Sequence, residues 1–216
     1  MPSTDLTRAT PASSSSGYRV LGVILAVIGS QTIYTATNHW SMMQAHELPL
    51  THADRAIPLL PWTTFVYLTD LPLCVSTYLH LRHHQARATY TYVLAYVFAV
   101  CTLCFLFFPT TYPRHLFPIP QGAAGAGILE WMRAMDTPRN AFPSLHVACC
   151  SAAILAFWHQ PETRLRDWMH IVWAACIVVS TLTTKQHFLV DVVAGTACSV
   201  AFHFILRRFN SGATAV

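Results

Sequence analysis

Six long apolar runs dominate the chain, and short polar stretches separate them. Each run is close to the ~20 residues that a helix needs to cross a ~30 Å hydrocarbon layer. The runs cover residues 18–37, 62–81, 91–109, 143–160, 168–184 and 188–206. The pattern therefore predicts an all-α polytopic membrane protein, a bundle of six transmembrane helices that forms a single domain over residues 18–208.

Both ends of the chain are polar. Residues 1–17 are rich in Ser and contain Pro, which predicts a disordered tail, and residues 209–216 form a second short tail. The first apolar run is longer than the 7–15 residues typical of a signal peptide, and no cleavage pattern follows it. We therefore expect that run to be retained as a helix.

The charged residues agree with a membrane location and indicate an orientation. Only 10% of the residues are charged, against about 25% in soluble domains. If six helices alternate, most of the 13 basic residues share one side with both tails, namely Arg8, Arg19, Arg82, Arg87, Arg164, Arg166, Arg207 and Arg208. Because cytoplasmic loops carry an excess of Arg and Lys, both tails are predicted to be cytoplasmic.

All seven cysteines fall inside apolar runs. A secreted disulfide framework would place paired cysteines in loops. The cysteines are therefore interpreted as small buried residues at helix contacts.

The longest outer connection, residues 110–142, contains an amphipathic segment. Apolar residues recur at helical spacing within 127–136, and charged residues lie between them. This predicts a short helix in the plane of the membrane interface. We expect it to guide the tail of a lipid.

Two histidines and a carboxylate gather at the outer ends of the last three predicted helices. Pro143 fits the first turn of a helix, which places Ser144 and His146 at a helix N-terminus, where free N–H groups favour an anion. His187 and Asp191 are four residues apart and are expected to share one face of the sixth helix. Asp191 then accepts a hydrogen bond from one ring nitrogen of His187 and leaves the other nitrogen free.

This arrangement suits phosphoryl transfer through a histidine. A neutral ring nitrogen attacks phosphorus while a carboxylate fixes its tautomer, and a second histidine protonates the leaving oxygen. Arg114, Arg139 and Lys185 approach the same depth from the outer connections and would neutralise the charge on the phosphoryl oxygens. We expect no metal and no other cofactor.

The same residues resemble the phosphatidic acid phosphatase type 2 superfamily. Its Pro-Ser-x-His signature is matched by residues 143–146, and its His-x-x-x-Asp by His187 and Asp191. The surrounding residues resemble the branch of the inositol phosphorylceramide synthases and their bacterial relatives. The resemblance implies His187 as the nucleophile, Asp191 as its orienting carboxylate, His146 as the general acid and Ser144 as a phosphate contact.

The family's phosphate-binding cations are matched less closely. Its first signature has a Lys followed by Arg-Pro, whereas here no Lys precedes Arg114 and the order is Pro113-Arg114. Its third signature carries an Arg six residues before the histidine, where this chain has Thr181. Arg114 is the predicted phosphate-binding arginine, and either Lys185 or Arg139 supplies the missing charge.

The predicted function is that of an integral membrane phosphatase that acts on a lipid phosphate or diphosphate. A lipid phosphotransferase of the inositol phosphorylceramide synthase type is the alternative, since an alcohol can replace water. Among other classes of function, a haem-binding protein could use His170 and His203. A transporter is disfavoured because the broken-helix repeats expected of transporters are not visible in the sequence. Asp70 is explained by a backbone break near Pro72 or by a polar neighbour.

The expected partners are a lipid phosphate and the bilayer, and no nucleic acid. The expected location is a bacterial inner membrane, with the active site on the periplasmic face. The sequence leaves the oligomeric state open.

Overall fold

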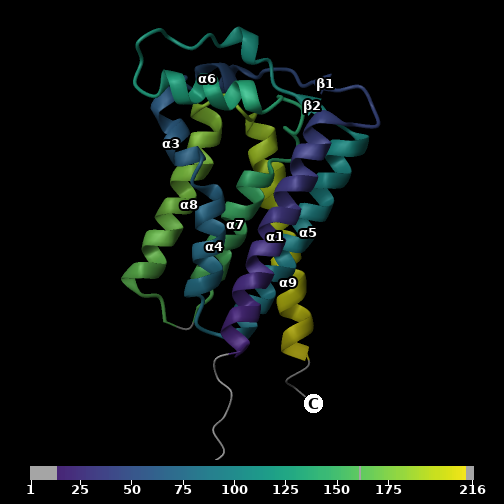
Figure 1. The fold of residues 1–216 in the computed structure, drawn as a ribbon, viewed down its shortest axis with the longest axis vertical. Coiled ribbons are helices and arrows are strands. Elements are labelled where there is room, and N and C mark those ends of the chain that lie inside the picture. Colours follow the sequence, from purple (N-terminus) through teal and green to yellow (C-terminus); the bar gives the residue numbers. More distant parts are fainter. Residues whose placement is uncertain (1–13, 161, 213–216) are drawn as a thin grey trace, which may run out of the picture.

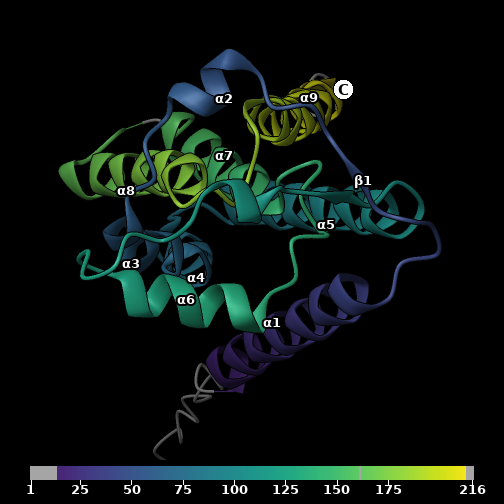
Figure 2. The same ribbon diagram turned by 90° about the horizontal axis from the view of Figure 1, so that it is seen from above.

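The computed structural model describes residues 14–160 and 162–212, which form a bundle of long helices with a cap of short elements over one end (Figure 1). The first and last described residues both lie at the opposite end, on different sides of the bundle (Figures 1 and 2). The predicted tails at 1–13 and 213–216 lie outside the described residues. Helix α1 begins at Ser14 and α9 ends at Gly212, and the single catalytic domain over residues 18–208 stays a prediction.

Five of the six predicted runs coincide with single helices. These are α1 (Ser14–His39), α5 (His84–Phe107), α7 (Leu145–Trp158), α8 (Leu165–Thr183) and α9 (Leu189–Gly212). Within the described residues, α5, α8 and the Leu189–Phe209 part of α9 are long and apolar enough to cross a membrane, and α7 is apolar but shorter. The helices therefore indicate a membrane protein, and the crossing by six helices stays a prediction.

The second predicted run is not one helix. It is divided into the 3₁₀ turn η1 (Pro61–Thr63), α3 (Thr64–Tyr67) and α4 (Asp70–His80). Pro72 has no N–H to donate to the carbonyl of Leu68, four residues earlier, so a continuous helix would lose a bond there. The break explains how the Asp70 carboxylate is accommodated, since it starts α4 and accepts a hydrogen bond from the Cys150 thiol at 3.5 Å.

Helix α7 lies at the centre of the bundle and packs closely on α9. Its buried face is made of small side chains, among them Ala148 and Ala152. The Ser199 hydroxyl of α9 donates to the carbonyl of Ala148 at 2.6 Å. A Cβ added at Gly195 would lie 2.5 Å from the carbonyl oxygen of Ser144. Small residues thus allow the two backbones to approach.

Replacing Gly195 with alanine is expected to destabilise the protein, although alanine favours a helix by up to ~1 kcal/mol. The added methyl meets backbone and would push α9 from the start of α7, at a cost of about 1–3 kcal/mol. Thermal unfolding in detergent measures the effect. Gly127→Ala is the matched control, because a Cβ there meets nothing within 4 Å. A Gly195→Ala protein as stable as the Gly127→Ala protein would contradict the close approach.

The cap lies across the end of the bundle opposite the described chain ends, and we call this the capped end (Figure 1). It contains α2 (His52–Ala56), the turn η2 (Arg114–Leu116), helix α6 (Ala126–Met135) and the strands β1 (His46–Glu47) and β2 (Thr110–Thr111), which pair in parallel. Helix α6 confirms the short helix predicted at 127–136. It buries Leu129 and Met132 and exposes Trp131.

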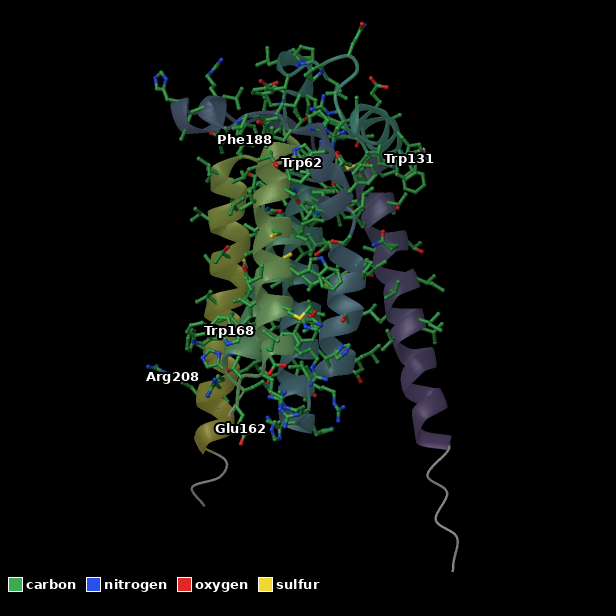
Figure 3. All side chains as sticks on the ribbon, turned by 90° about the vertical axis from the view of Figure 1, so that its left-hand side faces the viewer. Trp62, Trp131, Glu162, Trp168, Phe188 and Arg208 are labelled. Carbon is green, nitrogen blue, oxygen red and sulfur yellow. The ribbon has the colours of Figure 1, made fainter. Side chains whose placement is uncertain are left out.

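Exposed tryptophans mark both ends of the bundle. Trp62 and Trp131 lie near the capped end and Trp168 near the other end (Figure 3). Tryptophan favours the two membrane–water interfaces. This placement supports a membrane location with α6 at interface level.

The seven cysteines are all free. Cys101 and Cys150 are buried, as expected, but Cys176 is exposed on α8. The expectation of burial at helix contacts is therefore wrong for Cys176, because an apolar run also has a face turned away from the bundle.

Candidate active site

His187 lies in the turn between α8 and α9 at the capped end, next to Phe188 (Figure 3). Its Nδ1 is 3.0 Å from the carbonyl oxygen of Ala141 and 3.4 Å from Oδ2 of Asp191. Both partners are acceptors, so Nδ1 carries the hydrogen and Nε2 keeps its lone pair. The turn therefore presents a histidine whose tautomer suits nucleophilic attack.

Asp191 reaches His187 differently from the predicted arrangement. The two residues do not share a helical face, because α9 begins only at Leu189. The Asp191 carboxylate instead turns back over the start of α9, where Oδ2 accepts the N–H of Phe188 at 2.8 Å. Its Oδ1 is buried and has no hydrogen-bond partner within the described ranges. One carboxylate thus holds both the helix start and the imidazole.

His146 is the second residue of α7 and lies beside His187. The two ring centroids are 6.0 Å apart. The Tyr67 hydroxyl lies 3.3 Å from Nδ1 of His146, and the two rings are tilted against each other with centroids 4.4 Å apart. Tyr67 therefore holds one ring nitrogen, and the other is available for proton transfer.

Ser144 is the N-cap of α7, and its buried hydroxyl accepts the N–H of Val147 at 3.3 Å. The helix begins at Leu145, so Pro143 precedes the cap and is not in the first turn as expected. The cap satisfies one free N–H of the helix start. Ser144 does not line the pocket beside His187, and its predicted contact with phosphate stays a prediction.

Arg114 opens η2 and points its guanidinium at the His187 turn. Its Nη2 donates to Oδ2 of Asp136 at 3.0 Å and to the side-chain oxygen of Gln186. Its Nη1 donates to the carbonyl of Asp136, and its Nε is buried without a partner within the described ranges. A planar guanidinium is suited to bind two phosphoryl oxygens at once, and Arg114 is the predicted cation that lies next to His187.

A small polar pocket connects these groups. It has a volume of about 10 Å³, which is room for roughly one water molecule. Its walls are formed by Tyr34, Tyr67, Arg114, Asp136, Thr137, Pro138, Asn140, Ala141, Gln186 and His187. The pocket thus brings the Arg114 guanidinium and the His187 ring to one small space.

Lys185 does not line this pocket. Its backbone is left-handed, with φ of 56°. Its ammonium donates to the carbonyl of Asp54 at 2.6 Å and lies 4.4 Å from the centre of the Phe117 ring. Burial lowers the pKa of Lys185. The same Asp54 accepts the N–H of Leu189 at 2.8 Å through its carboxylate, so Asp54 and Lys185 brace the two sides of the His187 turn.

Arg139 is exposed and also lies outside the pocket lining. A different arginine, Arg133 of α6, lies close behind Arg114. It donates to the carbonyls of Phe117 at 2.9 Å and Thr184 at 3.4 Å. Burial and the charge of Arg114 lower the pKa of Arg133 to about 10. Four residues were predicted to bind phosphate, namely Arg114, Lys185, Arg139 and Ser144. Of these, only Arg114 lines the pocket.

Several pocket residues were missed from the sequence. Tyr34 comes from the first apolar run and Tyr67 from the second, where an aromatic residue gives no signal of its own. Asn140 is buried and donates to the Thr37 hydroxyl at 3.1 Å. For Asp136 and Gln186, the only signal in the sequence was a polar side chain near a predicted site residue.

The two histidines suggested as haem ligands, His170 and His203, each contact protein groups. Among the described residues, no three His, Cys, Asp or Glu side chains come together as candidate metal ligands. The His170 ring is near the Ser76 hydroxyl at 2.9 Å and the Arg166 carbonyl at 2.8 Å, one at each nitrogen. His203 packs instead on His159, with ring centroids 4.9 Å apart. The two suggested haem ligands therefore have separate partners.

The comparisons with known proteins agree with the geometry. The family model of the PAP2 superfamily matches residues 36–205, which is most of the chain and includes both histidines and Asp191. No curated protein and no solved structure matches the chain. The match does not select a branch of the superfamily, so the likeness to inositol phosphorylceramide synthases stays a prediction. The chain belongs to the PAP2 superfamily, and this membership supports a phosphatase or phosphotransferase type of activity.

Proposed function

We propose that the protein is an integral membrane phosphatase that hydrolyses a lipid phosphate or diphosphate through a phosphohistidine at His187. The observation that carries the proposal is the pair of contacts to Nδ1 of His187, from Ala141 and Asp191, with His146 beside it. A histidine held in this way is an activated nucleophile with its partner in reach. We further propose that the site faces the periplasm in a bacterial inner membrane.

In the first step, Nε2 of His187 bonds to phosphorus while the bond from phosphorus to the lipid oxygen breaks. Protonated His146 gives its proton to that oxygen, so the lipid leaves as an alcohol. Asp191 stabilises the positive charge that develops on His187, and Arg114 neutralises the phosphoryl oxygens. In the second step, water attacks phosphorus, His146 takes a proton from that water, and phosphate leaves His187.

A phosphohistidine can be resolved by water or by an alcohol such as inositol or ceramide. We propose hydrolysis because the outer connections of the chain are compact. The phosphotransferase remains the alternative, and added acceptor alcohols test it.

Replacing Asp191 with asparagine is expected to lower phosphate release by about 10²–10³-fold, the usual effect of removing one electrostatic contact to a developing charge. The carbonyl of Ala141 is the closer acceptor of Nδ1 and would still hold the tautomer. The loss therefore falls on kcat, with KM little changed. Steady-state rates on one lipid phosphate measure it. A rise in KM of the same size, with kcat unchanged, would contradict this role.

The proposed function is tested by phosphate release from a panel of lipid phosphates and diphosphates, in the presence of EDTA. The wild type is expected to release phosphate from at least one of them without added metal. If headgroup exchange with an added alcohol replaces phosphate release, the protein is a phosphotransferase. If neither reaction occurs with any lipid phosphate, the proposed function is wrong.

A further inference from the structure

An apolar cavity of about 680 Å³ lies between α1 and the helices α4, α5 and α7. This volume falls within the ~300–1,000 Å³ of ligand pockets. Figures 2 and 3 show α1 standing apart from α4 and α7 along most of its length. The top of α1 is fastened to the loop after α6, where Asn38 and Thr137 exchange hydrogen bonds of 2.8 Å.

The cavity begins at His146. His146 and Tyr34 both line it, and Tyr34 also forms part of the small polar pocket beside His187. In the proposed reaction, His146 protonates the oxygen that joins phosphorus to the lipid. The hydrocarbon chain starts at that oxygen, so it must leave the site at His146. The proposed reaction therefore places the first carbons of the hydrocarbon chain at the mouth of the cavity.

The far end of the cavity is near Gly22 on α1, Tyr78 on α4 and Thr91 on α5. Tyr34 and Gly22 are twelve residues apart, which is roughly 18 Å along a helix. One leaflet of the hydrocarbon core is about 15 Å thick, half of the ~30 Å total. The cavity is thus as deep as an ordinary lipid chain is long.

Two glycines line the cavity at different depths. Gly29 and Gly22 are seven residues apart on one face of α1, about 10 Å along the helix axis. A Cβ added at either position meets nothing within 4 Å. Larger side chains at these positions would therefore enter the cavity without striking backbone.

We propose that this cavity holds the hydrocarbon chain of the substrate whose phosphate reacts at His187, and that its depth sets the preferred chain length. The assignment rests on the proposed function and adds the class of substrate, a phosphate ester of one long alkyl or prenyl chain. The alternative occupant, a bulk lipid of the bilayer, would fill the cavity without any link to the reacting molecule.

The test compares kcat/KM of the full chain on n-alkyl phosphates from hexyl to octadecyl in mixed micelles. Gly29→Phe is expected to lower kcat/KM for hexadecyl phosphate by about tenfold or more, the effect of overfilling a packed site, and to leave hexyl phosphate within about twofold. Gly22→Phe is expected to affect only the longest chains. Ile28→Phe is the matched control, because Ile28 is exposed and lies outside the cavity lining.

The outcomes separate the two proposals. An unchanged chain-length profile in both glycine variants would overturn the cavity assignment and leave the phosphatase standing, and so would an equal loss on hexyl and hexadecyl phosphate. Absence of release from every alkyl phosphate, with release from another lipid phosphate or diphosphate of the panel, would overturn the single-chain assignment and leave the phosphatase standing. Absence of release from the whole panel would overturn both.

A second measurement does not depend on activity of the variants. A hexadecyl phosphate with a photoreactive diazirine at its chain end is expected to label the wild type near Tyr78 or Thr91. Labelling confined to exposed residues of α8 and α9, such as Val179 and Val193, would place the chain in bulk lipid and contradict the assignment.

Discussion

Replacing His187 with alanine is expected to lower phosphate release by about 10⁴-fold or more, the range seen when a catalytic nucleophile or its base is removed. His187 has its Nδ1 hydrogen occupied by Ala141 and Asp191, and no described side chain in the pocket offers a second imidazole nitrogen in the same position. Release of phosphate from a lipid phosphate, under single-turnover conditions, measures the chemical step directly.

The control for this variant is His83→Ala. His83 is exposed at the other end of the bundle, where it precedes α5 and its side chain makes no capping bond. That variant is expected to keep wild-type rates. A His187→Ala enzyme that is folded and retains more than a tenth of the activity would mean that another group attacks phosphorus.

Replacing His146 with alanine is expected to lower the rate by about 10²–10⁴-fold on an alkyl phosphate, the usual contribution of a general acid. An alkoxide leaves poorly unless it is protonated as the bond to phosphorus breaks. A nitrophenolate leaves without help, so the same variant is expected to lose far less activity on p-nitrophenyl phosphate. The ratio of the two losses isolates the proton transfer from any change in the fold.

The two losses distinguish a general acid from a structural residue. His146 contacts Tyr67, with Tyr34 and His187 near, so its removal also leaves a gap in packing. A packing defect would slow both substrates alike. Equal losses on the alkyl and aryl phosphates would therefore contradict the assignment of His146 as the acid.

The closeness of the two histidines, Ser144 and Asp191 to the capped end was predictable from the sequence because their relations are local. Ser144 and His146 are fixed by the start of one helix, and His187 and Asp191 by one short turn. Their pairing survives even though α9 begins two residues after His187, because the Asp191 carboxylate folds back over the turn. Arg114 was chosen within an outer connection by its likeness to the family's first signature, and it does line the pocket.

The rest of the pocket depended on packing between distant segments. Lys185 is only two residues from His187, yet its left-handed backbone sends its ammonium to Asp54. Tyr67 reaches His146 because Pro72 breaks the second run and separates α3 from α4. No pattern within one segment of the sequence predicts the contact of Lys185 with Asp54 or that of Tyr67 with His146. The cavity beside α1 likewise depends on how far that helix stands from its neighbours.

The central claim is that phosphate is carried on His187. The most direct test is to stop the reaction of a ³²P-labelled lipid phosphate within one turnover, in denaturant at alkaline pH, where phosphohistidine persists and phosphoester controls can be compared. Acid-labile label is expected on the peptide that contains His187 in the wild type, and none in the His187→Ala protein. Label on any other residue, or label that remains in the variant, would contradict it.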